Sequence, residues 1–176
     1  MLTTGQLTFF LHLALGVVMV HGFLSGLAML RRPARGRRQE AIHTVGMVGL
    51  ALAAWATAIT GTWLVYPGYR ADPAGTGAPD KAALLDHPKS ALLADPATAV
   101  WHEFGMEWKE HVGWLVPILV TVVAYLAVRH RDLLTHDRAT RRLAAGLLVV
   151  AVVGTVVAAG LGAVINAVAP NQFLAW

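Results

Sequence analysis

The chain has 176 residues, of which 56% are hydrophobic and only 14% are charged, and its mean hydropathy is +0.57. A soluble globular domain carries about 25% charged residues, so the composition excludes an ordinary soluble domain and predicts a polytopic membrane protein. The absence of cysteine excludes disulfides, thiolate zinc sites, iron–sulfur clusters and covalently attached c-type haem. The net charge is +4, but arginines beside apolar spans act as orientation signals, so no nucleic-acid partner is expected.

Four apolar stretches are long enough to cross a bilayer, which takes about 20 residues. The first is expected at residues 6–30, and we predict that it is retained, because no basic region or small-residue cleavage site marks a signal peptide. The others are expected at residues 41–66, 110–128 and 143–169. Together they predict an all-α fold, a single domain over residues 1–176 that forms an antiparallel four-helix transmembrane bundle.

Basic residues are concentrated in the two short connections between spans. Ten of the 14 Lys and Arg residues lie there, namely Arg31, Arg32, Arg35, Arg37, Arg38, Arg129, Arg131, Arg138, Arg141 and Arg142. The positive-inside rule places both connections on the cytoplasmic side. Both termini and the long middle loop are therefore expected on the outer side of the cell (cytoplasmic) membrane. Five of the six tryptophans fall at the expected outer ends, where amphipathic rings favour the interface, namely Trp63, Trp101, Trp108, Trp114 and Trp176.

The outer loop is expected at residues 67–109, and its first part is rich in turn residues from Pro67-Gly68 onward. Two similar segments follow at 81–88 and 89–96. Each contains a Leu-Leu pair, which we expect to dip into the membrane interface as a short amphipathic turn. Asp95-Pro96 has the residues of a helix start. A helix from there to Val128 is roughly 50 Å long, so this third helix is predicted to extend beyond the membrane.

Eight histidines in so apolar a chain are the main functional clue. Ionisable residues within spans are costly, and each is a functional candidate by default. His12 and His111 are expected near the outer face, and His21 and His43 toward the inner face. An outer pair and an inner pair are therefore predicted. The loop histidines are expected to be solvated, namely His87, His130 and His136.

A haem iron takes two imidazoles from facing helices at similar depth, and the core of a four-helix bundle is a common place for such a site. His12 and His21 are nine residues apart, about 900° around a helix, so they face opposite sides and cannot ligate one iron together. One or two haem b groups are therefore expected, with the axial ligands drawn from His12, His21, His43 and His111. The structural alternative for each is a histidine that is hydrogen-bonded to a carbonyl across the bundle.

With four spans and this placement of histidines, the chain resembles the four-helix membrane cytochromes b, including the haem-carrying anchor subunits of respiratory dehydrogenases. The resemblance covers all four spans and rests on architecture. The fourth span departs from it because it has no histidine. The resemblance implies b-type haem and electron transport to or from quinone or a partner redox subunit of a respiratory chain. Any enzymatic role is then at most that of an electron-transfer subunit in an oxidoreductase complex.

A second group of candidates lies between residues 101 and 111. Glu103, Glu107 and Glu110 are spaced to share one helix face that leads toward His111. Together with His102 they are candidates for proton transfer, quinone protonation or binding of a divalent metal. The structural alternative is a solvated helix face.

The end of the second span offers two more candidates. Tyr66 and Arg70 are placed to contact a quinone or a haem propionate. An interfacial aromatic ring beside a snorkelling arginine is the structural alternative.

The sequence leaves two other functions open. The first is a non-catalytic accessory or structural subunit of a larger membrane complex, with other membrane subunits or a homo-oligomer as partners. The second is a small ion, metal or proton carrier that uses the acidic residues of the third helix. No nucleophile–base pair, phosphate loop or dinucleotide fingerprint is visible, which argues against a stand-alone hydrolase or kinase.

Overall fold

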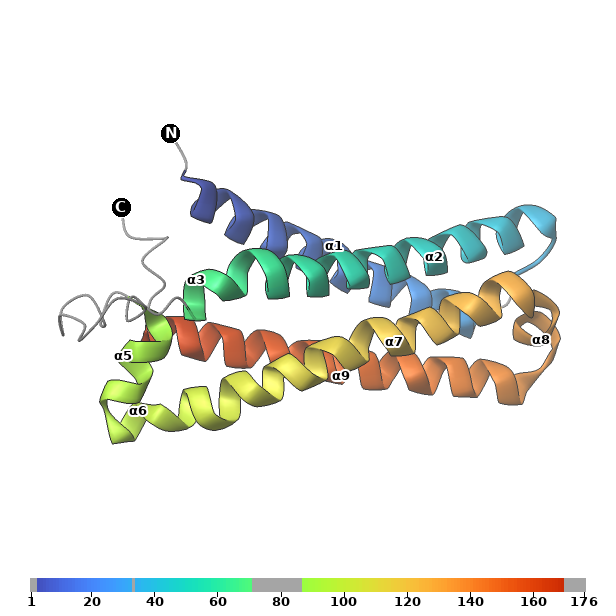
Figure 1. The fold of residues 1–176 in the computed structure, drawn as a ribbon. Coiled ribbons are helices and arrows are strands. Elements are labelled where there is room, and N and C mark those ends of the chain that lie inside the picture. Colours follow the sequence, from blue (N-terminus) through green and yellow to red (C-terminus); the bar gives the residue numbers. More distant parts are fainter. Residues whose placement is uncertain (1–2, 33, 71–86, 170–176) are drawn as a thin grey trace. The chain divides into compact units, whose positions relative to one another are not determined.

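The computed structural model describes residues 3–32, 34–70 and 87–169. All regular structure in these three ranges is helical, which confirms the all-α prediction (Figure 1). The elements in chain order are α1 (Thr4–Arg31), α2 (Arg37–Thr60), η1 (Gly61–Val65), α3 (Tyr66–Arg70), α5 (Pro88–Ala94), α6 (Pro96–Val100), η3 (Trp101–Met106), α7 (Glu107–Arg129), α8 (Arg131–His136) and α9 (Arg138–Val168).

Four continuous helical stretches are long and apolar enough to cross a membrane. They cover Thr4–Arg31, Arg37–Arg70, Pro96–Arg129 and Arg138–Val168. The first closely matches its predicted span, the last begins at Arg138 rather than at residue 143, and the middle two extend beyond their predicted spans. These helices support a multi-pass membrane protein.

The third long helix begins where the sequence predicted. Asp95 is its N-cap, and the carboxylate of Asp95 accepts a hydrogen bond from the backbone N–H of Ala97 at 2.9 Å. Pro96 follows in the first turn, where its missing N–H costs nothing. The helix then continues for 34 residues to Arg129. The helix therefore includes 14 residues before residue 110, where the membrane span itself was predicted to begin.

Two π-helical segments interrupt the long helices, η1 in the second and η3 in the third. A π turn bonds residue i to i+5, so each segment rotates the residues that follow it relative to an uninterrupted α-helix. Such segments are frequent at functional sites. Each of the two leads directly into residues of the candidate site described below.

The chain divides into two compact units, and each draws on all four long helices. Unit 1 contains the described parts of residues 1–12, 59–112 and 156–176. Unit 2 contains the described parts of residues 13–58 and 113–155, which include both basic connections.

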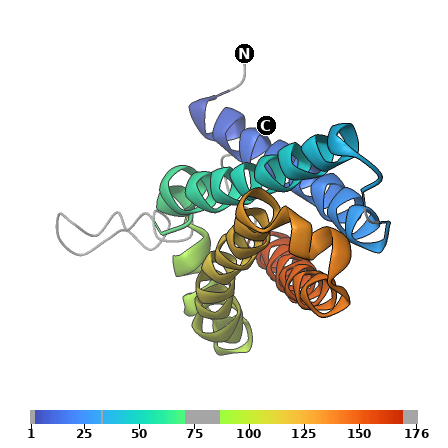
Figure 2. The same cartoon turned by 90° about the vertical axis from the view of Figure 1, so that its right-hand side faces the viewer.

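The core of unit 2 is built from apolar side chains of α1, α2, α7 and α9. Figure 2 shows the ribbons of these helices from the side of α8. Leu148 and Val123 are fully buried there. Gly22 allows α1 and α2 to approach closely, because a Cβ at this position would lie 2.8 Å from Leu50 Cδ1. Lipid offers no hydrophobic drive for association, so small residues and tight packing hold helices together in a membrane.

Trp55 and Trp114 meet inside unit 2. Their ring centroids are 5.9 Å apart, and the Trp55 indole N–H donates to the Thr121 hydroxyl at 2.9 Å. Thr121 in turn donates to the carbonyl of Pro117. Trp114, which was predicted to mark an outer interface, thus packs against Trp55, the one tryptophan that was expected in the middle of a span.

Truncation of Leu148 to alanine is expected to destabilise the fold by about 2 kcal/mol, because it leaves a cavity that lipid does not fill. Leu143→Ala on the same helix is the matched control, since Leu143 is 60% exposed. Unfolding in SDS mixed micelles measures both variants. Equal loss of stability in the two variants would show that this core is not packed as described.

The smaller core of unit 1 consists of Tyr69, Leu92, Met106, Ile165 and Ala169. Leu92 lies on α5, within the second of the two similar segments, and is only 1% exposed. The prediction that this Leu-Leu pair dips into the membrane interface is therefore wrong for Leu92, because the residue packs into the core of its own unit. Residues 81–86 of the first segment, which include its Leu-Leu pair, lie outside the described residues.

Candidate functional site

Polar side chains gather in unit 1 where α3, η3 and the first turn of α7 meet. We call this group the tyrosine cluster, and its members are Tyr66, Tyr69, Arg70, His102 and Glu110. Four of the five are sequence-predicted candidates, and Tyr69 was missed. Residues 67–68 were predicted to begin a turn, whereas Tyr66–Arg70 is helical. Pro67 lies where the second long helix continues from η1 into α3, and the helix places Tyr69 one turn after Tyr66.

Tyr69 is the most enclosed member of the cluster. Its ring is only 4% exposed, and its hydroxyl oxygen lies 2.9 Å from His102 Nδ1. The two ring centroids are 5.9 Å apart. A phenol and an imidazole can each donate and accept a hydrogen bond, so the tautomer of His102 decides which of the two groups donates in this contact.

Tyr66 forms the second hydrogen-bonded pair of the cluster. Its hydroxyl is hydrogen-bonded to the Glu110 side chain. Its ring stacks on that of Tyr69, with centroids 5.8 Å apart and an angle of 20° between the planes. The guanidinium carbon of Arg70 lies 5.9 Å from the centroid of the Tyr66 ring, within the range of a cation–π contact.

Glu110 provides an unused acceptor in the cluster. Its Oε1 atom is buried and has no hydrogen-bond partner within the described residues. A buried carboxylate oxygen without a partner is costly, because it has lost water and gained nothing in exchange. The cluster therefore presents one acceptor that a bound ligand or water can satisfy.

Lys109 lies next to the cluster and was not singled out by the sequence. A Cβ at Gly162 of α9 would lie 2.9 Å from Lys109 Nζ, so glycine at this position makes room for the ammonium group. A lysine followed by a glutamate at the start of a long apolar helix is the signal that sequence reasoning could have used.

The three glutamates that were predicted to share one helix face do not all line the site. Glu103 and Glu107 are exposed, whereas Glu110 is half-buried beside Tyr66. The η3 turn between residues 101 and 106 changes the helical spacing on which the prediction of one shared face relied. In the three described ranges, no three His, Cys, Asp or Glu side chains are grouped so that they could hold a metal ion. The structure thus gives no support to the divalent-metal alternative.

Each predicted histidine pair falls within one unit: His12 and His111 in unit 1, His21 and His43 in unit 2. The His12 ring is held in place by its surroundings. Its Nδ1 lies 3.2 Å from the Thr60 hydroxyl, and a Cβ at Gly61 would lie only 2.8 Å from its Cε1. Gly61 therefore provides a cradle for the imidazole.

His21 and His111 have the same local hydrogen bond. Nδ1 of His21 lies 2.9 Å from the Val17 carbonyl, and Nδ1 of His111 lies 2.7 Å from the Glu107 carbonyl. A carbonyl only accepts, so Nδ1 carries the proton and the neutral ring has its lone pair on Nε2. Both side chains are exposed. The carbonyls belong to the histidines' own helices rather than to a helix across the bundle.

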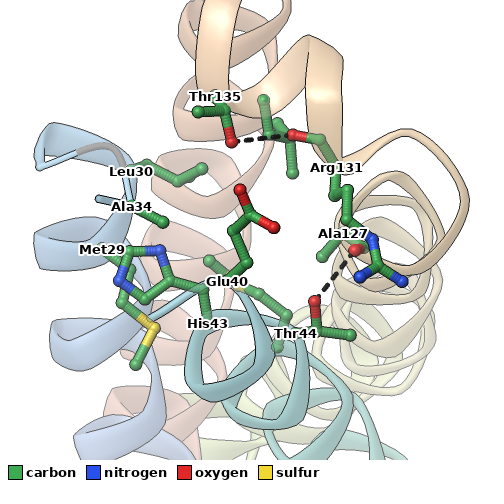
Figure 3. A pocket seen from close by; sticks show the side chains of 11 residues that line it. Met29, Leu30, Ala34, Glu40, His43, Thr44, Ala127, Arg131 and Thr135 are labelled. Atoms are coloured by element: carbon green, nitrogen blue, oxygen red, sulfur yellow. Dashed lines mark hydrogen bonds between the residues drawn. The ribbon is translucent and has the colours of Figure 1, made fainter. Parts of the chain in front are cut away.

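His43 is half-buried in unit 2 and lines two cavities. The smaller has a volume of about 40 Å³ and includes Glu40, Thr44 and Thr135 in its wall (Figure 3). It is large enough for ordered water, which needs about 10–15 Å³ and polar partners. The larger is an open groove of about 860 Å³. No described contact joins His43 to His21.

No family model, curated protein or solved structure matches this chain.

Proposed function

We propose that this chain is a membrane-embedded b-type haem electron-transfer subunit, and that it exchanges electrons and protons with a quinone at the tyrosine cluster. The observation that carries the proposal is the juxtaposition of two hydrogen-bonded pairs, Tyr69–His102 and Tyr66–Glu110. Ionisable groups in long apolar helices are expensive and usually functional.

Quinone chemistry requires what the cluster offers. Reduction of a quinone to a quinol takes two electrons and two protons, one proton for each ring oxygen. Each hydrogen-bonded pair can give one proton or take one back in the reverse reaction. Arg70 supplies a positive charge beside Tyr66, which favours the negative charge that the quinone gains on reduction.

Haem b held by the candidate histidines would carry the electrons. His12 would be the best placed of them to hold the iron, because Gly61 leaves room for its ring and Thr60 fixes the ring's orientation. His111 is its proposed partner in unit 1, and His21 with His43 is the proposed pair in unit 2. Bound haem would supply a one-electron redox centre, the potential of which depends on these ligands and their hydrogen bonds.

The proposed setting is the cytoplasmic membrane, with the two basic connections on the cytoplasmic side and both termini outside. A partner redox subunit, or a second copy of this chain, is the proposed source or acceptor of the electrons. A haem subunit of this kind then acts as one part of an oxidoreductase complex.

Alanine variants at His12, His21, His43 and His111 test the haem assignment. Replacement of a true ligand is expected to remove the absorbance of the haem that it holds, measured as the reduced-minus-oxidised spectrum per folded chain. His136→Ala is the control, because His136 is an exposed residue at the end of α8. Full haem content in all four variants would refute the assignment.

A further inference from the structure

The open groove in unit 2 lies where the end of α1 meets the beginning of α2. Nine residues line it, three of them are arginines and none is acidic. The polar members of its wall are Ser25, Arg31, Arg32, Arg35, Gln39 and His43. A groove with this lining favours an anionic ligand.

We infer that this groove binds the headgroup of an anionic membrane phospholipid. Guanidinium groups present planar, bidentate donors that match phosphate oxygens. The groove also adjoins the beginning of α2 at Arg37, and the N-terminal end of a helix favours negative charge. Basic pockets between transmembrane helices are suited to lipid phosphates.

The apolar surroundings of the groove identify a lipid rather than a free ion. Ala28 and Ile42 are part of its wall. About one turn farther from the connection, Leu24 on α1 is 65% exposed and Val45 on α2 is 70% exposed. A polar groove that continues into exposed apolar side chains fits a molecule with a phosphate at one end and acyl chains at the other.

A titration of the full-length, detergent-purified protein with phosphatidylglycerol tests the inference, with bound lipid counted by native mass spectrometry. The test variant replaces Arg31, Arg32 and Arg35 by glutamine. Each basic residue near an anionic lipid contributes about a factor of five. The lipid Kd is therefore expected to rise about a hundredfold.

The control variant removes the same charge from the other basic connection. It replaces Arg129, Arg138 and Arg142 by glutamine, all three of which are exposed. The control is expected to bind phosphatidylglycerol as tightly as the unmodified protein does. Both proteins are expected to retain less phosphatidylcholine than phosphatidylglycerol.

Three results would overturn the inference. Equal weakening of phosphatidylglycerol binding in both variants would show that the lipid is attracted by the overall positive charge and not by this groove. Displacement of the lipid by inorganic phosphate at equal concentration would show a small-anion site. Loss of haem from the groove variant, with lipid binding unchanged, would show that the arginines hold haem propionates.

Discussion

Replacement of Tyr69 by phenylalanine is expected to slow quinol-driven haem reduction by at least about a hundredfold, the usual contribution of a positioned acid or base. The variant loses only the hydroxyl that contacts His102 and keeps the ring that stacks on Tyr66. The haem spectrum and the thermal stability should therefore stay close to those of the unmodified protein. Stopped-flow mixing with a quinol, followed at the haem α band, measures the rate.

Tyr125→Phe is the matched control for this variant. Tyr125 also lies beside a histidine, with its ring centroid 5.6 Å from that of His130, but it is 56% exposed and belongs to unit 2. Its replacement should leave the reduction rate unchanged. Equal rates in Tyr69→Phe and the unmodified protein would remove the tyrosine cluster from the proposed mechanism.

Replacement of Gly61 by valine is expected to displace the His12 imidazole. Even the first added carbon would lie 2.8 Å from His12 Cε1, and the ring cannot move away without losing its contact with Thr60. If His12 is an axial ligand, the affinity for its haem should fall about 10- to 100-fold or more, as it does when groups that orient a ligand are lost. A haem titration of the purified variant measures the affinity.

Gly49→Val on α2 is the control for this change. Gly49 lies in the α-helical part of the same long helix as Gly61, and a Cβ there has no side chain or other helix within 4 Å. The control introduces the same side chain on this helix, and its first added carbon contacts no histidine. Full haem affinity in Gly61→Val would show that His12 does not ligate the iron.

Much of the fold could be predicted from the sequence, because each decisive signal was local. Long apolar runs required spanning helices, and the Asp95-Pro96 pair marked the start of the third one. The ends of the long helices were less predictable. Residues 66–70 continue the second helix through Pro67 and Gly68, since packing of Tyr69 into the unit 1 core outweighs their preference for a turn.

The site could be predicted only as separate pieces. Tyr66, His102 and Glu110 were recognised as polar residues at the ends of apolar spans, but their assembly depends on two π-helical segments. A π turn has no clear sequence signature, and it changes which residues share a face. For this reason the three glutamates do not share one face of the site as predicted, and Tyr69 was missed.

The most direct test of the account is the reduced-minus-oxidised visible spectrum of the detergent-purified protein, combined with a pyridine haemochrome count. We expect sharp α and β bands and one or two b-type haems per chain. A flat spectrum from fully folded protein would contradict it. The histidines would then have structural or proton-handling roles, and the function of a non-catalytic accessory subunit would take the place of electron transfer.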